Sequence, residues 1–250
     1  GKVCPEKGLI MSNIEKFLEM VQESDNIVFF GGAGVSTESG IPDFRSVDGL
    51  YNQKYDYPPE TILSHTFYMR HTEEFYRFYR DKMLCLDAKP NVTHQKLAEL
   101  EAAGKVKAVI TQNIDGLHQM AGSRRVLELH GSVHRNYCQK CGKGFDAEYI
   151  LKSGTEIPLC DACGGKIKPD VVLYEEGLNQ QTLEDAVFYI SHADVLIIGG
   201  TSLAVYPAAG LIDYYRGNKL VLINKSTTPM DGRADLLIQA GLGEEFSQIR

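Results

Sequence analysis

Amide, carboxylate and imidazole side chains follow two apolar segments of this 250-residue chain, where buried strands would end. Gln112, Asn113, Ile114 and Asp115 come after the segment 106–110, and His130 comes after 126–129. Open α/β sheets bind their ligands at the carboxyl ends of the strands, and an imidazole can act there as a general base near neutral pH. Helix caps could account for one or two of these residues, and a lone histidine is more often structural. The cluster as a whole nevertheless predicts a catalytic or binding site.

Two Cys-x-x-Cys pairs have the spacing of a four-thiolate zinc site. Their members are Cys138, Cys141, Cys160 and Cys163. Four thiolates complete a tetrahedral coordination shell, so this metal would be structural rather than catalytic. Two disulfides or a redox pair are the alternative, which the lack of a secretory signal disfavours. The remaining cysteines, Cys4 and Cys85, lie outside the set and look incidental.

Glycine-rich turns follow two further apolar segments, 27–30 and 195–198. The turns contain Gly32, Ala33 and Gly34 in the first case and Gly200, Thr201 and Ser202 in the second. Such turns bring backbone N–H groups close to an anion, so we predict a phosphate site. The dinucleotide fingerprint Gly-x-Gly-x-x-Gly is incomplete, because Thr37 stands at the third glycine, and a turn without a ligand remains the alternative. Asn224, at the end of the segment 220–223, could reach a ribose hydroxyl.

The first glycine turn leads into Gly40-Ile41-Pro42-Asp43-Phe44-Arg45. A helix cannot simply continue past Pro42. We therefore predict a loop that carries an aromatic side chain and an arginine, and a second irregular loop over 48–59, where Gly, Asp, Tyr and Pro are frequent.

Strands and helices alternate along the chain. Apolar segments predict strands at 27–30, 106–110, 126–129, 171–174, 195–198 and 220–223. Helical spacing predicts helices over 12–24, 72–83, 93–103 and 183–190, with another beginning near Pro207. Ser12 and Glu15 form a possible capping box for the first helix, and Gly104 would close the third. The order of elements is that of an α/β protein with one small cysteine-bearing insert.

Composition excludes several classes of protein. The formal net charge of -7 argues against general affinity for nucleic acid or anionic membranes. No apolar segment reaches the ~20 residues of a membrane span, and the N-terminal residues lack the apolar core of a signal peptide, so we expect a cytoplasmic protein. Met11 resembles a natural start, and residues 1–11 are interpreted as an N-terminal extension.

Six separated motifs, taken in order, resemble the sirtuin family. They are Gly32-Ala33-Gly34-Val35-Ser36, Gly40-Ile41-Pro42-Asp43-Phe44-Arg45, Thr111-Gln112-Asn113-Ile114-Asp115, Leu129-His130-Gly131, the four cysteines, and Gly200-Thr201-Ser202-Leu203. The resemblance implies an α/β fold, a Rossmann-like parallel sheet with helices on both faces plus a small zinc-ribbon insert domain. The NAD-binding domain would comprise 12–133 and 168–250, the zinc module 134–167, and the helical part of the small domain about 48–90.

The implied activity is that of an NAD-dependent protein-lysine deacylase, most simply a deacetylase. Its products would be nicotinamide, O-acyl-ADP-ribose and free lysine. By the same resemblance His130 is the base for a ribose hydroxyl, and Asn113 fixes the ribose or an ordered water. Asp115 and the backbone of Ile114 would hold the nicotinamide carboxamide, Phe44 would shield the reacting face, and Arg45 would orient the loop and the phosphates. The other residues implied in the NAD pocket are Gly32, Ala33, Gly34, Thr37, Gln112, Gly200, Thr201, Ser202 and Asn224.

The acylated peptide would lie as an extra strand between the segment 172–178 and the loop after Ser202, against Val172, Leu173, Tyr174 and Glu175. Family members often read Phe-Gly-Glu where this chain has Tyr174-Glu175-Glu176, so an acid replaces a glycine and could favour basic residues beside the target lysine. Members that remove acidic acyl groups pair a tyrosine with an arginine three residues later. Here Tyr76 is followed at that spacing by Tyr79, with Arg80 one residue further, so we expect a neutral acyl group such as acetyl.

Two other functions are weighed against this one. An NAD-dependent protein ADP-ribosyltransferase would use the same cofactor and leave ADP-ribose on a protein. A non-catalytic zinc-ribbon module would bind nucleic acid or a partner, but the acidic composition and the cluster around His130 speak against it. The expected partners are proteins with acylated lysines, with neither nucleic acid nor membrane. The sequence specifies neither the protein substrates nor the oligomeric state. A monomer is compatible with it.

Overall fold

A parallel sheet in the order β3-β2-β1-β7-β8-β9 forms the centre of the computed structural model, which describes residues 10–43 and 55–250. Its strands are β1 (Ile27–Gly31), β2 (Val106–Thr111), β3 (Val126–Glu128), β7 (Val195–Gly199), β8 (Leu220–Ile223) and β9 (Leu236–Ile238). All residues of β1, β7 and β8 are buried, which requires cover on both faces. This is the doubly wound order of dinucleotide-binding folds, and the order reverses between β1 and β7.

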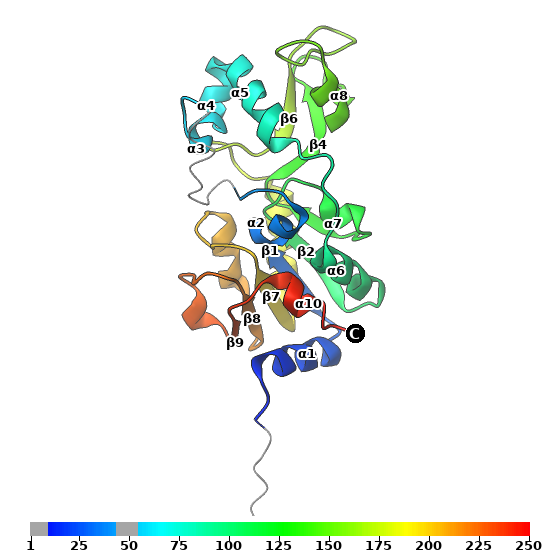
Figure 1. Ribbon diagram of the computed structural model, residues 1–250, viewed down its shortest axis with the longest axis vertical. Helices are drawn as coiled ribbons and strands as arrows, with labels where there is room; N and C mark the ends of the chain where they lie inside the picture. Colours follow the sequence, from blue (N-terminus) through cyan, green and yellow to red (C-terminus); the bar gives the residue numbers. More distant parts are fainter. Residues whose placement is uncertain (1–9, 44–54) are drawn as a thin grey trace, which may run out of the picture.

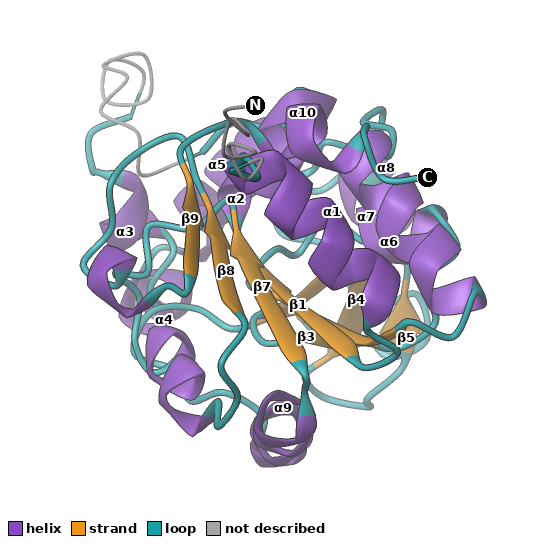
Figure 2. Cartoon of the chain, turned by 90° about the horizontal axis from the view of Figure 1, so that it is seen from below, coloured by secondary structure: helices purple, strands orange, loops and turns teal. Residues whose placement is uncertain are grey.

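Helices cover both faces of this sheet (Figure 2). One face packs on α1 (Asn13–Glu23), α6 (Val92–Ala102) and α10 (Leu242–Phe246), and the other on α9 (Gln180–His192) and the 3₁₀ helix η3 (Ala208–Tyr214). Neighbouring residues of β1 point to opposite cores, Phe29 to the first and Phe30 to the second. The short helices of this lobe are α2 (Ala33–Ser36), η1 (Thr37–Ser39), α7 (Leu117–Met120) and η4 (Asp231–Arg233).

A second, smaller lobe is built on an antiparallel sheet in the order β5-β4-β6 (Figure 1). Its strands are β4 (Gly131–Cys138), β5 (Gly144–Phe145) and β6 (Ile167–Val171). Its helices are α3 (Pro59–Ile62), α4 (His65–Arg70), α5 (Thr72–Phe78), the π-helical turn η2 (Tyr79–Met83) and α8 (Ala147–Lys152). Aromatic side chains of α5 and η2, among them Phe75 and Tyr79, share one buried core with Ile150 and Ile167.

Most of the predicted elements are confirmed within one or two residues, and the fold class is confirmed. The capping box of α1 forms as expected, because the Ser12 hydroxyl and the Glu15 carboxylate each accept a hydrogen bond from the other residue's backbone N–H. The helix expected near Pro207 is the 3₁₀ helix η3. No helix in the described part of the chain has the length and apolar composition to cross a bilayer.

The predicted strand 171–174 of the large sheet is wrong. The strand in this region, β6, ends at Val171 and belongs to the antiparallel sheet of the small lobe. Beyond Val171 the backbone turns toward the helices of that lobe, because Tyr174 N–H donates to the Leu63 carbonyl and His65 N–H donates to the Tyr174 carbonyl. A short apolar segment does not reveal in sequence which of two sheets it will join. Of the predicted loop 48–59, residues up to 54 lie outside the described part, and α3 begins at Pro59.

Candidate active site

The register of the sheet brings the predicted residues to one edge. Gly31 pairs with Thr111 on one side and with Gly199 on the other, Thr111 pairs with Glu128, and Gly199 pairs with Ile223. These residues end their strands, so the segments that follow all start from the same edge. The two glycine turns, the cluster 112–115, His130 and Asn224 therefore meet where the strand order reverses.

A cavity of about 560 Å³ opens between this edge and the small lobe. Of the residues predicted from the sequence, it is lined by Ala33, Gln112, Asn113, Ile114, Asp115, His130, Val172, Leu173, Tyr174, Glu175, Gly200, Thr201 and Ser202. Gly32, Gly34, Thr37 and Asn224 are not among the lining residues, and Phe44 and Arg45 lie outside the described residues. Further lining residues had no functional signal in the sequence, among them Leu63, Lys82, Met83 and Cys85.

His130 is held in one tautomer by the neighbouring strand end. Its Nδ1 lies 3.0 Å from the Gln112 carbonyl oxygen, which can only accept a hydrogen bond, so Nδ1 carries the proton. In the neutral ring Nε2 is then the basic nitrogen. His130 also lines the cavity, as a general base for a bound hydroxyl would have to do.

Asp115 and Asn113 share a buried hydroxyl, that of Ser36. Ser36 Oγ donates to Asp115 Oδ2 at 2.6 Å, and Asn113 Nδ2 donates to Ser36 Oγ at 3.3 Å and to the Gly32 carbonyl at 2.8 Å. The second carboxylate oxygen of Asp115 accepts from Leu117 N–H at 2.9 Å. Ser36 belongs to the glycine motif, but the sequence did not indicate that its hydroxyl orients the 113–115 segment.

A pair of buried histidines lies behind Ser36. His94 accepts from Asn91 N–H at Nδ1, so its Nε2 bears the proton and faces Ser36 Oγ at 3.5 Å. The rings of His94 and His118 meet edge to face with centroids 4.7 Å apart, and neither His118 nitrogen has a hydrogen-bond partner among the described residues. Burial lowers the pKa of His94 to about 4 and, together with the neighbouring His94, lowers the pKa of His118 to about 3. Both rings are therefore neutral at physiological pH.

The two glycine turns pack directly against each other. Gly34 N–H donates to the Gly200 carbonyl at 2.7 Å, and a Cβ on Gly34 would lie only 2.6 Å from the Gly200 Cα. Because the two backbones approach so closely, neither position has room for a side chain. Packing alone would therefore account for both glycines, whether or not the turns also bind a phosphate. Thr201 Oγ1 donates to Gln112 Oε1 at 2.8 Å, and Asn224 Nδ2 donates to the Thr201 carbonyl at 3.0 Å, so side chains fix the second turn.

Strand β4 of the small lobe holds the loop that contains Asp115. Val133 N–H donates to the Ile114 carbonyl at 3.0 Å, and His134 Nε2 donates to the Asp115 carbonyl at 3.0 Å. Gly116 has a φ of 71° and packs on the His134 ring, where a Cβ would lie 2.7 Å from Cδ2. The small lobe therefore holds this loop through a backbone hydrogen bond and through the His134 side chain, and so shapes one side of the cavity.

Arg80 and Tyr76, the arginine and tyrosine nearest to the pattern that recognises acidic acyl groups, do not line the cavity. Arg80 Nε donates to the Ile150 carbonyl at 3.0 Å and its Nη1 to the Glu156 carbonyl at 2.9 Å. Tyr76 is fully buried and its hydroxyl donates to the Ile167 carbonyl. Both residues tie α5 and η2 to the cysteine-bearing part of the small lobe.

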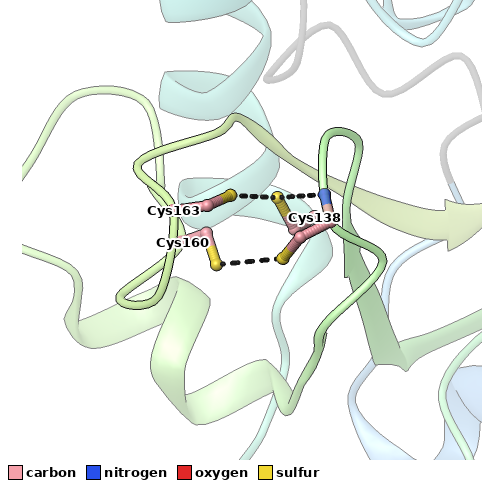
Figure 3. A group of neighbouring side chains, drawn as sticks. Cys138, Cys160 and Cys163 are labelled. Carbon is pink, nitrogen blue, oxygen red and sulfur yellow. Dashed lines mark hydrogen bonds between the residues drawn. The ribbon is translucent and has the colours of Figure 1, made fainter.

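The four predicted metal ligands lie together in the small lobe. Figure 3 labels three of them, Cys138, Cys160 and Cys163. All four Sγ atoms lie within 4.8 Å of one another, with Cys138 and Cys163 3.4 Å apart and Cys141 and Cys160 3.6 Å apart. Disulfide sulfurs would be about 2.05 Å apart, whereas four sulfurs around zinc at about 2.3 Å are separated by about 3.8 Å. Backbone N–H groups of Cys141 and Lys140 point at the Cys138 sulfur and lower the pKa of that thiol. The cluster fits a closed tetrahedral metal site.

Comparisons of the sequence and of the fold with known proteins point to one family. A model of the Sir2 family matches residues 32–207. An NAD-dependent protein deacetylase of Clostridium acetobutylicum is 62% identical over 243 residues, covering 96% of this chain and 99% of the relative. A solved structure described as Sir2 with a p53 peptide and NAD+ is 42% identical, with a TM-score of 0.84 over 95% of this chain and 97% of that one. Another, with a deacetylated p53 peptide and 3'-O-acetyl ADP ribose, has a TM-score of 0.85 at 42% identity, covering 94% and 96%. The chain belongs to the Sir2 family.

Proposed function

We propose that this protein is an NAD-dependent protein-lysine deacetylase that forms nicotinamide, O-acetyl-ADP-ribose and free lysine. The observation that carries the proposal is the placement of His130, whose Nδ1 is anchored on the Gln112 carbonyl while the residue lines the cavity at the edge of the sheet. Relatives named as deacetylases at up to 62% identity, and a related structure containing a deacetylated peptide and an acetylated ADP-ribose, support it.

In this proposal NAD supplies the nicotinamide–ribose bond that breaks and the ADP-ribose that accepts the acyl group. His130 takes a proton from a ribose hydroxyl at Nε2. Asn113 orients the ribose or an ordered water, and Asp115 with the Ile114 backbone holds the carboxamide of nicotinamide. Ser36 keeps the Asp115 carboxylate in place, since it donates to Oδ2.

The remaining residues proposed to bind NAD belong to the two glycine turns and their surroundings. They are Gly32, Ala33, Gly34, Thr37, Phe44, Arg45, Gln112, Gly200, Thr201, Ser202 and Asn224. The acylated peptide is proposed to lie along Val172, Leu173, Tyr174 and Glu175. Because Arg80 is held by two backbone carbonyls, we expect an uncharged acyl group, acetyl being the simplest.

We also propose that Zn²⁺ is the metal at the cysteine cluster, in a purely structural role. We propose the division of the chain into an NAD-binding domain of 12–133 and 168–250 and a zinc module of 134–167. The helices within 48–90 complete the small domain with that module. The cytoplasm is the proposed compartment, since NAD and reduced thiolates are both maintained there.

The test is nicotinamide release from NAD with and without an acetyl-lysine peptide. We expect release to depend on the peptide and to fall about a thousandfold or more in His130→Ala, because a general base and the orientation of its ring are lost together. The paired substitution His192→Ala, in an exposed residue at the end of α9 that does not line the cavity, serves as a comparison and should retain much more activity. A His130→Ala protein with normal turnover would refute the assignment. Radiolabel from NAD retained on a protein without any acyl substrate would instead favour ADP-ribosyl transfer.

A further inference from the structure

One wall of the cavity is a turn whose backbone is hydrogen-bonded to other segments at both of its ends. At its start Val172 N–H donates to the His130 carbonyl at 2.9 Å. At its far end Tyr174 pairs with the turn between α3 and α4 through two backbone hydrogen bonds of 2.9 Å, to Leu63 and from His65. The wall, residues 172–176, thus connects the strand end that bears the proposed catalytic histidine to the helices of the small lobe.

Glu175 stands in this wall in a conformation that favours glycine. Its φ is 75°, and only one other non-glycine among the described residues, Leu203, also has a positive φ. A residue with a Cβ pays a conformational cost in this region, so a carboxylate there requires a compensating interaction.

The compensating interaction is a two-point contact with Thr66 at the start of α4. Thr66 N–H donates to Glu175 Oε1 at 3.0 Å, and Thr66 Oγ1 donates to Oε2 at 2.8 Å. Hydrogen bonds to an ionised carboxylate are stronger than neutral ones, and the same two bonds lower the pKa of Glu175, which keeps it ionised. Glu176 adds a second connection, accepting from His65 Nδ1 at 2.8 Å and from Leu173 N–H at 2.9 Å.

We propose that Glu175 is a positioning residue for the acylated peptide, because its contact with Thr66 fixes the shape of the wall against which the peptide binds. This proposal rests on the deacetylase function proposed above. The sequence analysis expected the Glu175 carboxylate to attract basic residues of the substrate, and this proposal replaces that role with a structural one. Both carboxylate oxygens are already directed at Thr66, so the main effect of Glu175 is on the backbone of the wall.

The experiment measures peptide KM, NAD KM and kcat for wild type, Glu175→Ala, Glu175→Gln, Thr66→Val and the double variant Glu175→Ala/Thr66→Val. We expect Glu175→Ala to raise peptide KM about fivefold, with kcat and NAD KM changed less than about twofold. Thr66→Val keeps the backbone N–H donor and should raise peptide KM by a smaller factor, about twofold to threefold. Glu175→Gln, which keeps an acceptor oxygen, should recover part of the loss. The double variant should be no worse than Glu175→Ala, because Glu175→Ala already removes both hydrogen bonds to Thr66.

Glu60→Gln is the matched control, since Glu60 is an exposed carboxylate that also lines the cavity. Each variant is assayed on one peptide with neutral flanks and one with basic flanks. A loss confined to the basic peptide and equal in Glu60→Gln and Glu175→Gln would mean simple charge attraction and overturn the proposal. A wild-type peptide KM in Glu175→Ala would also overturn it. If Glu175→Ala does not fold, Glu175→Gln and Thr66→Val decide the question by the same KM criterion. Failure of His130→Ala to lose activity would refute the function itself, whereas an inactive His130→Ala with normal Glu175 variants would refute only this inference.

Discussion

The protonation and orientation of the polar side chains at this site depend on their hydrogen-bond partners. The Gln112 carbonyl selects the His130 tautomer, and the Ser36 hydroxyl holds one oxygen of Asp115. These partners come from a segment after β2 and from α2, 18 and 79 positions away in the sequence. The residue types at 112–115 and 130 could therefore be predicted from their positions after apolar segments, while their protonation and orientation could not.

Ser36→Ala tests the hydroxyl that holds Asp115. Its loss leaves Asp115 Oδ2 without the 2.6 Å hydrogen bond, and we expect kcat/KM for NAD to fall about tenfold, since a hydrogen bond to a charged group contributes about 1.5 kcal/mol or more. The measurement is steady-state nicotinamide release over a range of NAD concentrations. Ser39→Ala, which removes a hydroxyl that accepts from Asn91, is the control and should change NAD kinetics much less. Equal NAD kinetics in Ser36→Ala and wild type would contradict the role given to Ser36.

At the scale of elements, α6 and α7 bury the two histidines side by side. His94 is completely buried and His118 is 1% exposed. Folding lowers their pKa values to about 4 and about 3, mainly through burial, from about 6.5 in the unfolded chain. Between pH 6.5 and 4 the unfolded chain therefore binds protons that the folded chain does not, and stability must fall as the pH falls through this range.

We expect the free energy of unfolding to decrease below pH 6.5 by about 1.4 kcal/mol per pH unit for each of the two histidines. Urea unfolding at several pH values between 7 and 4.5 measures this slope. His118→Leu removes one titrating ring and should cut this contribution by about half, whereas His71→Ala, at an exposed position, should leave the slope unchanged. An identical acid slope in His118→Leu would show that other groups cause the destabilisation.

Secondary-structure elements were predicted well where the pattern of neighbouring residues determines them. They were predicted poorly where a hydrogen-bond partner distant in sequence determines them. The capping box of α1 and the fully apolar strands β1, β7 and β8 follow from residues near in sequence. The segment 171–174 was assigned to the wrong sheet, because its backbone partners, Leu63 and His65, lie more than 100 positions away. Likewise, Gly34 and Gly200 are needed where two distant turns touch, which no local fingerprint expresses.

At the scale of the whole molecule, the cysteine cluster lies apart from the cavity but in the lobe that shapes it. Strand β4 ends at Cys138, and β6 begins four residues after Cys163. At the opposite ends of these strands Gly131 of β4, which follows His130, pairs with Val171 of β6. The core of this lobe also includes α5 and η2. Metal binding should therefore support activity from a distance.

Metal removal tests this dependence. We expect a strong chelator to lower the melting temperature and to abolish deacetylation, with recovery on adding Zn²⁺, because a structural zinc contributes on the order of 10 kcal/mol to folding. Hydrogen exchange should show loss of protection in β4, β5 and β6 before the large sheet. Cys160→Ser should behave like the chelated protein, while Cys85→Ser should retain its zinc. A metal-free protein with an unchanged melting temperature and intact protection in β4 would contradict a structural role.

The sequence by itself determined the alternation of strands and helices, the four thiolates of a metal site and the residue types of a site at strand ends. These features depend on periodicity and on short spacings, which are properties of neighbouring residues. Only the tertiary structure decided the partner of each polar atom: Gln112 for His130, Ser36 for Asp115 and Thr66 for Glu175. The physical reason is that a hydrogen bond requires two atoms within about 3 Å, and the folded chain alone brings such distant residues together.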